Sequence, residues 1–283
     1  DLTAFSYQTE RYSMGAFAKC DCWTQRRNVM VIWDREQPKS FRLRGIHNGY
    51  DFCSGMVYAD QKQNCILGNI GLVTDRGTVH YILDKDKSGV YDVEELLFRF
   101  ELGGFCEHTQ ITQEDSDFFV CDKDIRIRLH IAQWVFDGKN GAVRLSNDRK
   151  AVELIGYRGE SVRMDTRKLG NTYGVFSLCV EEQNEEPADA VTVALTADGK
   201  VISECGDLTV TSPAYSVPYR RALGLDLPEY GKMEQRIQTI LEKMKHMDAD
   251  GTVAETCPIS IISMDAWEWP QGVALFAMYQ YYR

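Results

Sequence analysis

The segment Ile125–Leu129, with the sequence IRIRL, alternates apolar and charged side chains without interruption. Side chains of a β-strand point to opposite faces at successive residues, so this pattern predicts a strand with one buried and one solvated face. Phe41–Arg44 and Leu97–Leu102 alternate in the same way. One-sided strands of this kind are typical of antiparallel sheets that cover a core with one face.

Further short runs of β-branched and aromatic residues fill the first three quarters of the chain. They are Val29–Trp33, Met56–Ala59, Cys65–Val73, Thr78–Leu83, Phe118–Cys121, Tyr173–Val180, Ala190–Leu195 and Asp207–Thr211. Turn sequences such as Gly103-Gly104 and Asp137-Gly138 separate them. Many short strands at close spacing predict an antiparallel β-sandwich domain over residues 1–215.

The pattern changes to helical in residues 216–283. Residues 228–247 carry one apolar stripe at helical spacing, and residues 271–282 are apolar or aromatic on nearly every side. An amphipathic outer helix followed by a buried inner one predicts the first hairpin of an (α/α)6-type toroid. The segment 271–282 ends without a capping signal, so we expect a second polypeptide or a C-terminal barrel portion to complete the toroid.

Composition excludes several classes of partner. The 283 residues include 42 acidic and 32 basic side chains, a formal net charge of −10, which disfavours nucleic acid and anionic membrane surfaces. No apolar run is long enough to span a membrane, and no signal peptide is visible, so we expect a cytoplasmic protein. The nine cysteines form no CxxC pair, which predicts reduced thiols and no structural zinc site.

Two polar segments are candidates for chemistry in the β-rich part. Residues 84–95 match the spacing of a calcium loop, with glycine at the sixth position and oxygen ligands at Asp84, Asp86, Ser88, Asp92 and Glu95. The flanking segments have strand patterns, so a polar hairpin loop is the alternative, and no other cofactor is expected.

The second candidate, Arg44–Asp51, gathers polar and aromatic groups directly after a strand. Arg44 could bind a carboxylate, while His47 or Tyr50 could exchange protons. Asn48-Gly49 is also a favoured hairpin turn, so a purely structural role stays open.

The helical part contains the third candidate. Trp267 and Trp269 flank an acidic residue at the start of the apolar helix, and Gln271 follows in its first turn. Tryptophan faces suit sugar rings, and the Gln271 amide can hydrogen-bond to hydroxyl groups; ordinary core packing is the alternative.

This segment, with its Trp-x-Trp-x-x-Gly-Val pattern and Tyr-Tyr end, resembles the first barrel helix of glycoside hydrolase families 105 and 88, the unsaturated glucuronyl and rhamnogalacturonyl hydrolases. The resemblance covers about the last fifth of the chain. The β-rich part is similar to the β-sandwich domains of heparinase-like polysaccharide lyases.

The resemblance implies a hydrolase that removes a terminal unsaturated uronic acid from lyase-generated oligosaccharides. In that family an aspartic acid protonates the enol-ether double bond, and water then adds. Trp267, Trp269 and Gln271 would line the substrate pocket, while the catalytic aspartates of the family lie on later barrel helices, beyond this sequence. Two alternatives remain: a polysaccharide lyase using Arg44, His47 and Tyr50, and a non-catalytic carbohydrate-binding or assembly sandwich.

Overall fold

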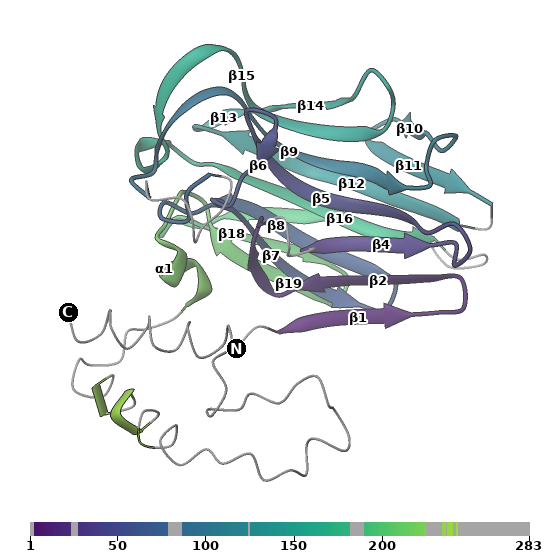
Figure 1. Cartoon of the computed structure of the whole chain (residues 1–283), viewed down its shortest axis with the longest axis horizontal. Helices are drawn as coiled ribbons and strands as arrows, with labels where there is room; N and C mark the ends of the chain where they lie inside the picture. Colours follow the sequence, from purple (N-terminus) through teal and green to yellow (C-terminus); the bar gives the residue numbers. More distant parts are fainter. Residues whose placement is uncertain are drawn as a thin grey trace, which may run out of the picture. The chain divides into compact units, whose positions relative to one another are not determined.

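The computed structural model describes residues 3–23, 28–78, 87–123, 125–181 and 190–224, and six helical residues between 234 and 242. The chain divides into two compact units, residues 1–225 and 226–283. The first unit is mainly β with antiparallel sheets, which confirms the expected class of fold (Figure 1). The six helical residues fall within the helix expected over 228–247.

Eight strands form the first sheet, which we call sheet A. In spatial order they run β1, β2, β4, β5, β9, β15 and β14, and β6 pairs with β5. Their bounds are β1 (Ala4–Gln8), β2 (Tyr12–Phe17), β4 (Val29–Trp33), β5 (Lys39–His47), β6 (Tyr50–Asp51), β9 (Val90–Gly104), β14 (Ala142–Leu145) and β15 (Ala151–Asp165). The 15-residue strand β9 lies at the middle of the sheet and pairs with β5 and β15.

Another eight strands form sheet B. Its spatial order is β10, β11, β12, β16, β8, β7 and β3, and β13 pairs with β12. The bounds are β3 (Lys19–Asp21), β7 (Gly55–Lys62), β8 (Cys65–Leu72), β10 (Ile111–Glu114), β11 (Asp117–Asp122), β12 (Ile125–Phe136), β13 (Lys139–Asn140) and β16 (Tyr173–Glu181). The IRIRL segment is therefore the first part of the long strand β12.

The main core lies between the two sheets. Phe41 and Phe100 project inward from neighbouring strands of sheet A, with ring centroids 6.0 Å apart. Phe176 of sheet B meets the Phe100 ring edge to face at 4.9 Å. All three rings are almost completely buried, so the alternating apolar residues of both sheets meet in one core.

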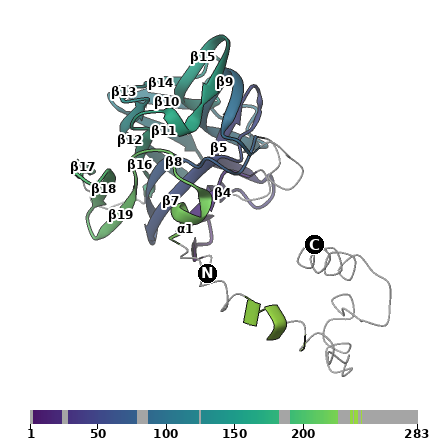
Figure 2. The same ribbon diagram turned by 90° about the vertical axis from the view of Figure 1, so that its left-hand side faces the viewer.

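A third, three-stranded sheet covers the outer face of sheet B. It consists of β17 (Thr192–Leu195), β18 (Lys200–Cys205) and β19 (Leu208–Pro213). Leu208 and Val210 pack against Met56, Tyr58 and Leu67 of β7 and β8 in a second apolar cluster. Figure 2 shows the three sheets as successive layers. The short helix α1 (Tyr219–Leu223) follows β19.

The structure corrects the expectation that all cysteines are free thiols. Cys65 of β8 and Cys179 of β16 lie directly opposite each other in the register and form a disulfide. The two residues are 114 positions apart in sequence, and only the pairing of β8 with β16 brings them together. Six other described cysteines are in no disulfide, and five of these six are buried.

Two expectations lie wholly or mostly outside the described residues. The strand expected at Thr78–Leu83 is described only at Thr78, and the apolar helix at 271–282 is not described at all. Within the described part of the chain, no helix combines the length and apolarity needed to cross a membrane.

Candidate functional site

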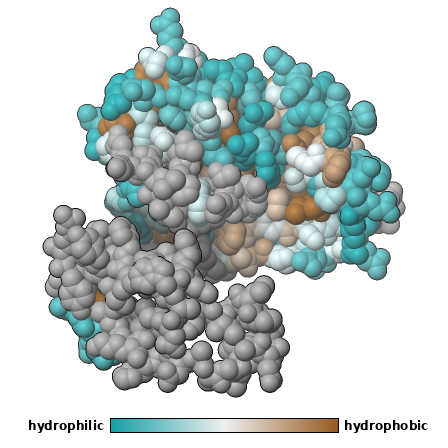
Figure 3. Space-filling view, in the orientation of Figure 1, coloured by the Kyte–Doolittle hydropathy of each residue, from teal (hydrophilic) through white to brown (hydrophobic). Residues whose placement is uncertain are grey.

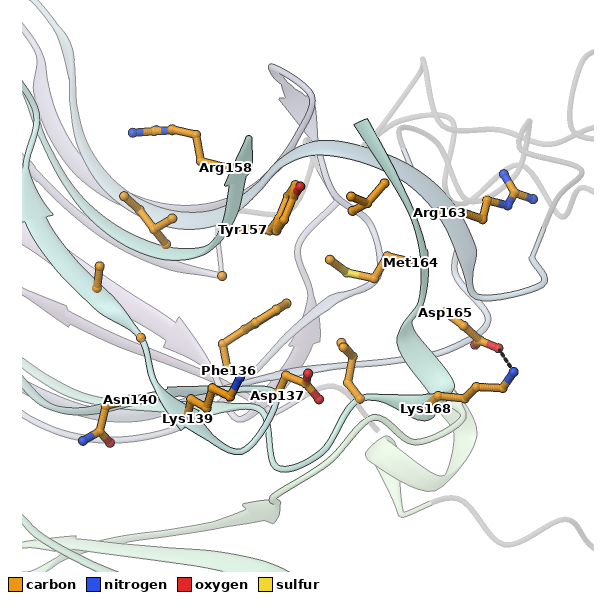
Figure 4. Close-up of a pocket in the computed structure, with 16 residues that line it drawn as sticks. Phe136, Asp137, Lys139, Asn140, Tyr157, Arg158, Arg163, Met164, Asp165 and Lys168 are labelled. Atoms are coloured by element: carbon orange, nitrogen blue, oxygen red, sulfur yellow. Dashed lines mark ion pairs between the residues drawn. The ribbon is translucent and has the colours of Figure 1, made fainter. Parts of the chain in front are cut away.

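A broad groove of about 840 Å³ opens where β12 ends, and segments from three parts of the chain line it (Figure 4). These are the β12–β13 hairpin with the start of β14, the middle of β15, and the end of β15 with the 3₁₀ turn Thr166–Lys168. The volume lies in the range of roughly 300–1,000 Å³ that is usual for small-ligand sites. The groove is therefore large enough for one or more sugar units.

The β12–β13 hairpin fixes one side of the groove. Phe136 pairs with Lys139, so the loop between them is the two residues Asp137 and Gly138, with φ of 50° and 74°. These positive angles are those of a type I′ turn, for which Asp-Gly is a favoured sequence. The backbone N–H of Gly170 donates to Asp137 Oδ1 at 2.7 Å, which ties the turn to the segment that follows β15.

The opposite side of the groove is an irregular part of β15. Its pairing with β9 shifts register between Ile155 and Tyr157, and again between Arg158 and Val162. Such bulges bend a strand and redirect its side chains. The Tyr157 hydroxyl donates to the backbone carbonyl of Glu160 at 2.7 Å, which fixes the orientation of the ring.

Half-buried apolar groups form the floor. Phe136, Tyr157, Met164 and Leu169 pack against the main core with one side, and each also lines the groove. The Phe136 ring packs directly against the backbone of β15 at Gly156, because a Cβ at this position would lie only 2.6 Å from the ring. Figure 4 shows Phe136, Tyr157 and Met164 projecting toward the same space.

Charged side chains line the rim, and most of them already have partners. Arg158 binds Glu95 and Glu153, and Arg163 binds Asp92. The hydrogen bond from Arg167 holds the pKa of Asp165 well below its usual value.

Two lysines also line the rim, of which Lys168 is paired with a carboxylate but largely exposed. The Lys168 ammonium is 3.5 Å from Asp165, and its side chain is 82% exposed. The side chains of Lys139 and Asn140 have no hydrogen bond or ion pair with any other residue in the described part of the chain. The groove thus combines an apolar aromatic floor with cationic and amide donors at its rim.

The residues of the proposed calcium loop are only partly described. Asp84 and Asp86 lie outside the described residues. The Ser88 hydroxyl accepts the backbone N–H of Val90, where β9 begins, so Asp92 and Glu95 lie on a strand. Their carboxylates pair with Arg163 and Arg158, and the described residues hold no group of three or more acidic, histidine or cysteine side chains suited to a metal.

The structure does not bring Arg44, His47 and Tyr50 into one constellation. Phe41 and Leu43 of β5 project into the core, so by alternation His47 points inward and Arg44 outward. The His47 ring packs near Phe52 and Tyr91, whereas the Tyr50 side chain is exposed.

The turn between His47 and Tyr50 is a hairpin. Asn48 and Gly49 have φ of 49° and 80°, and β5 pairs with β6 on either side of them, as their sequence predicts. Asn48 also binds the neighbouring strand β9, because its Oδ1 accepts hydrogen bonds from the backbone N–H groups of Glu94 and Glu95.

Trp267, Trp269 and Gln271, the pocket residues implied by the family resemblance, lie outside the described residues. The groove residues Phe136, Tyr157, Met164, Lys139 and Lys168 were not expected from the sequence. The Asp137-Gly138 turn was the one signal near them, and it predicts a hairpin rather than a site.

A smaller hollow of about 210 Å³ lies over β1, β2 and β4, with Phe17, Met30 and Ile32 among its lining residues. Figure 3 shows apolar side chains, in brown, gathered on this side of the molecule among hydrophilic ones. No charged residue of the described chain lines this hollow, and Ser6 and Ser13 are the polar side chains in its lining, so it offers mainly apolar contact.

No protein-family model, curated protein or solved structure matches this chain.

Proposed function

We propose that the first unit of this protein is an oligosaccharide-binding β-sandwich whose ligands carry uronic acid groups. The observation that carries the proposal is the groove itself: it has half-buried Phe136 and Tyr157 rings beneath the Lys139 and Asn140 side chains, which have no partner in the described part of the chain, and beneath the exposed Lys168. Apolar faces of pyranose rings pack on aromatic side chains, while their hydroxyl and carboxylate groups need polar partners. The groove offers both within one volume.

The charge of the protein supports a local role for the two lysines. The chain carries a formal net charge of −10, so a uronate approaching most of its surface is repelled. Arg158, Arg163 and Lys168 each pair with a carboxylate, but Lys168 is the most exposed of the three, with 82% of its side chain accessible. Lys139 has no ion pair in the described part of the chain, so the ammonium groups of Lys139 and Lys168 are the cationic contacts most open to a ligand. Recognition of an acidic sugar at this groove would depend on them.

Because residues 228–283 resemble the glycuronyl hydrolases, we further propose that this unit is part of a larger enzyme. In that view, the sandwich belongs to a hydrolase that removes terminal unsaturated uronic acid, and Trp267, Trp269 and Gln271 border its active site. The aspartic acid that donates the proton would lie in the remainder of an (α/α) barrel. The lyase alternative loses its main support, because Arg44 and His47 project from opposite faces of β5.

The test is isothermal titration calorimetry of the full chain with oligosaccharides that end in unsaturated uronic acid. We expect Tyr157→Ala to weaken binding about tenfold through the loss of ring contact. Tyr157→Phe, which lacks only the hydroxyl that bonds to Glu160, should stay close to wild type. The double variant Lys139→Gln/Lys168→Gln should weaken binding and reduce its dependence on salt.

The matched control is Phe105→Ala, because Phe105 is 54% exposed and does not line the groove. Binding that is unchanged in Tyr157→Ala and in the lysine double variant would contradict the proposal. The enzymatic part is tested separately with the ultraviolet absorbance of the unsaturated uronate. A hydrolase abolishes that absorbance, whereas a lyase acting on an intact polysaccharide creates it.

A further inference from the structure

Strand β1 is the last strand at one end of sheet A, and among the described strands it pairs with β2 alone (Figure 1). The Ala18 N–H donates to the Thr3 carbonyl and the Thr9 N–H donates to the Tyr12 carbonyl, both at 2.9 Å. Backbone bonds to one neighbour involve every second residue of a strand, so the odd-numbered residues of β1 bond toward β2. The N–H and C=O groups of its even-numbered residues point to the free edge, and these residues are Ala4, Ser6 and Gln8.

This edge lacks the features that prevent the ends of sheets from pairing with other chains. Such features are charged side chains, prolines, bulges and very short strands. β1 has the five residues AFSYQ, without a charge or a proline, and its register with β2 is regular. Among the other strands at the ends of the three sheets, the four-residue β17 (TVAL) is also uncharged. The remaining ones carry Arg144 in β14, Glu114 in β10, Lys19 and Asp21 in β3, and Pro213 in β19.

The free backbone groups of β1 complement those of a second copy of the chain. When two β1 strands run antiparallel about a two-fold axis at Ser6, the two Ser6 residues lie opposite each other, and Ala4 of each copy lies opposite Gln8 of the other. Directly opposed residues whose N–H and C=O groups face each other exchange two hydrogen bonds. Every backbone group at the free edge of β1 therefore gains a partner in this register.

The side chains of β1 suit the same register. Phe5 and Tyr7 are half-buried and pack against the main core. In the two-fold arrangement Phe5 of one copy lies opposite Tyr7 of the other, and aromatic cross-strand pairs stabilise a sheet. On the outer face the small Ser6 side chains meet at the axis, so no bulky group keeps the two strands apart.

Charge also favours this edge as the place where two copies meet. Each chain carries a formal net charge of −10, which makes most of the surface repel a second copy, whereas β1 and the apolar hollow beside it are uncharged. In the two-fold register, Glu10 of one copy approaches the end of β1 at which the other copy has Lys19, directly after Ala18. Arg11, in the same turn as Glu10, lines a separate hollow together with Asp34. Opposite charges thus approach each other at both ends of the strand pair.

We propose that this protein binds a second copy of itself through antiparallel pairing of the two β1 strands about a two-fold axis at Ser6. Sheet A then continues from one copy into the other. Only five residues of each chain pair, so the interface is small and the dissociation constant is about 10–100 µM. The inference does not depend on sugar binding, because the groove lies at β14 and β15, at the opposite end of sheet A.

Sedimentation velocity of the full chain between about 1 and 500 µM tests this association. We expect the weight-average mass to rise with concentration from 32.3 kDa toward twice that value. Ser6→Lys and Ser6→Glu each bring like charges together at the axis, so each variant should dissociate at least about tenfold more readily. An equimolar mixture of the two variants should associate again, because opposite charges then meet at the axis.

The controls separate lost association from lost folding. Ser6 is exposed and its backbone does not bond to β2, so both variants should unfold at the same urea concentration as dilute wild-type protein. Thr192→Lys is the matched control for an added charge, because Thr192 is an exposed residue of β17, the other uncharged end strand. This variant should associate like wild type.

Three results would overturn the proposal. The first is a wild-type chain that stays monomeric over the whole range, which would leave the edge of β1 to another part of the chain or to a different protein. The second is association that survives in Ser6→Lys, or that is lost in Thr192→Lys instead. The third is a mixture of the Ser6→Lys and Ser6→Glu variants that stays monomeric, since the two-fold register requires these positions to meet.

Discussion

Arg44 and Arg99 lie directly opposite each other on the neighbouring strands β5 and β9. Like charges in this position destabilise a sheet unless other groups compensate. Here Asp51 and Glu101 bind Arg44 at 2.7 and 3.0 Å, and Glu101 also faces Arg99. The outer face of sheet A is thus stabilised by a network of alternating charges rather than by isolated pairs.

The first prediction concerns Glu101, which contacts three arginines of this network. Glu101→Gln leaves Arg42, Arg44 and Arg99 without their shared anion and should lower the free energy of unfolding by about 1–3 kcal/mol. Glu114→Gln is the matched control, because its pair with Arg126 is exposed and 3.5 Å long. Urea denaturation measures both. Equal effects of the two variants would show that the network contributes no more than a surface ion pair.

The second prediction concerns the groove floor. Gly156→Ala places a Cβ 2.6 Å from the Phe136 ring, so the ring must move. We expect a loss of about 1–3 kcal/mol in stability, as for other overpacked sites, together with weaker oligosaccharide binding. The control Gly71→Ala adds a Cβ whose nearest neighbour is 3.7 Å away, an ordinary contact. Wild-type binding and stability in Gly156→Ala would refute the described contact between β15 and Phe136.

The third prediction concerns the pH dependence of folding stability that arises from Asp34, in the loop between β4 and β5. A hydrogen bond from Lys123 lowers the pKa of Asp34 from 3.8 to about 2. Because the pKa is lowered in the folded state, the carboxylate contributes stability above about pH 4, and this contribution is lost as the pH falls from 4 through about 2. Asp34→Asn should therefore be less stable than wild type at pH 6, and the difference should shrink steadily as the pH falls from 4 to 2.

A double-mutant cycle with Lys123→Gln isolates this pair. The coupling between Asp34 and Lys123, measured from denaturation midpoints, should be clearly smaller at pH 2 than at pH 6. A coupling that is the same at both pH values would contradict the assignment of the low pKa to this hydrogen bond.

The fourth prediction concerns the disulfide. Peptide mapping without reductant should recover Cys65 and Cys179 in one linked pair, and reduction should release both. Disulfides persist in oxidising compartments, so a linked pair in freshly isolated protein would argue against the expected cytoplasmic location. Prompt alkylation of both thiols in native protein from cells would instead agree with that expectation, and would show that the strand pairing holds them together without the bond.

Local patterns in the sequence predicted those strands whose apolar residues form a continuous run or alternate with charged ones. The apolar run Val29–Trp33 forms β4, and the alternating IRIRL segment forms the first part of β12. The 15-residue strand β15 was not expected. Its residues beyond Ile155 are largely exposed and include two glycines and several charges, so no alternating apolar face identifies it.

The candidate site was less predictable than the fold. The groove combines Phe136, Tyr157 and Met164 from segments that meet only through the pairing of β15 with β9 and the end of β12. None of these residues belongs to a local motif. Arg44 and His47 are close in sequence, yet an odd spacing on a strand sends them to opposite faces.

The pairing of β8 with β16 also has a consequence for the protein during its synthesis. Strand β7 precedes β8, but the other partner of β8, strand β16, is made much later: the paired residues Cys65 and Cys179 are 114 positions apart, which takes roughly 5–25 seconds of translation. Throughout that interval one edge of an apolar strand has no partner and can pair with another nascent chain. Chaperone binding to residues 65–72 on the ribosome, or slower elongation before residue 174, would therefore influence the yield of native protein more than its final stability does.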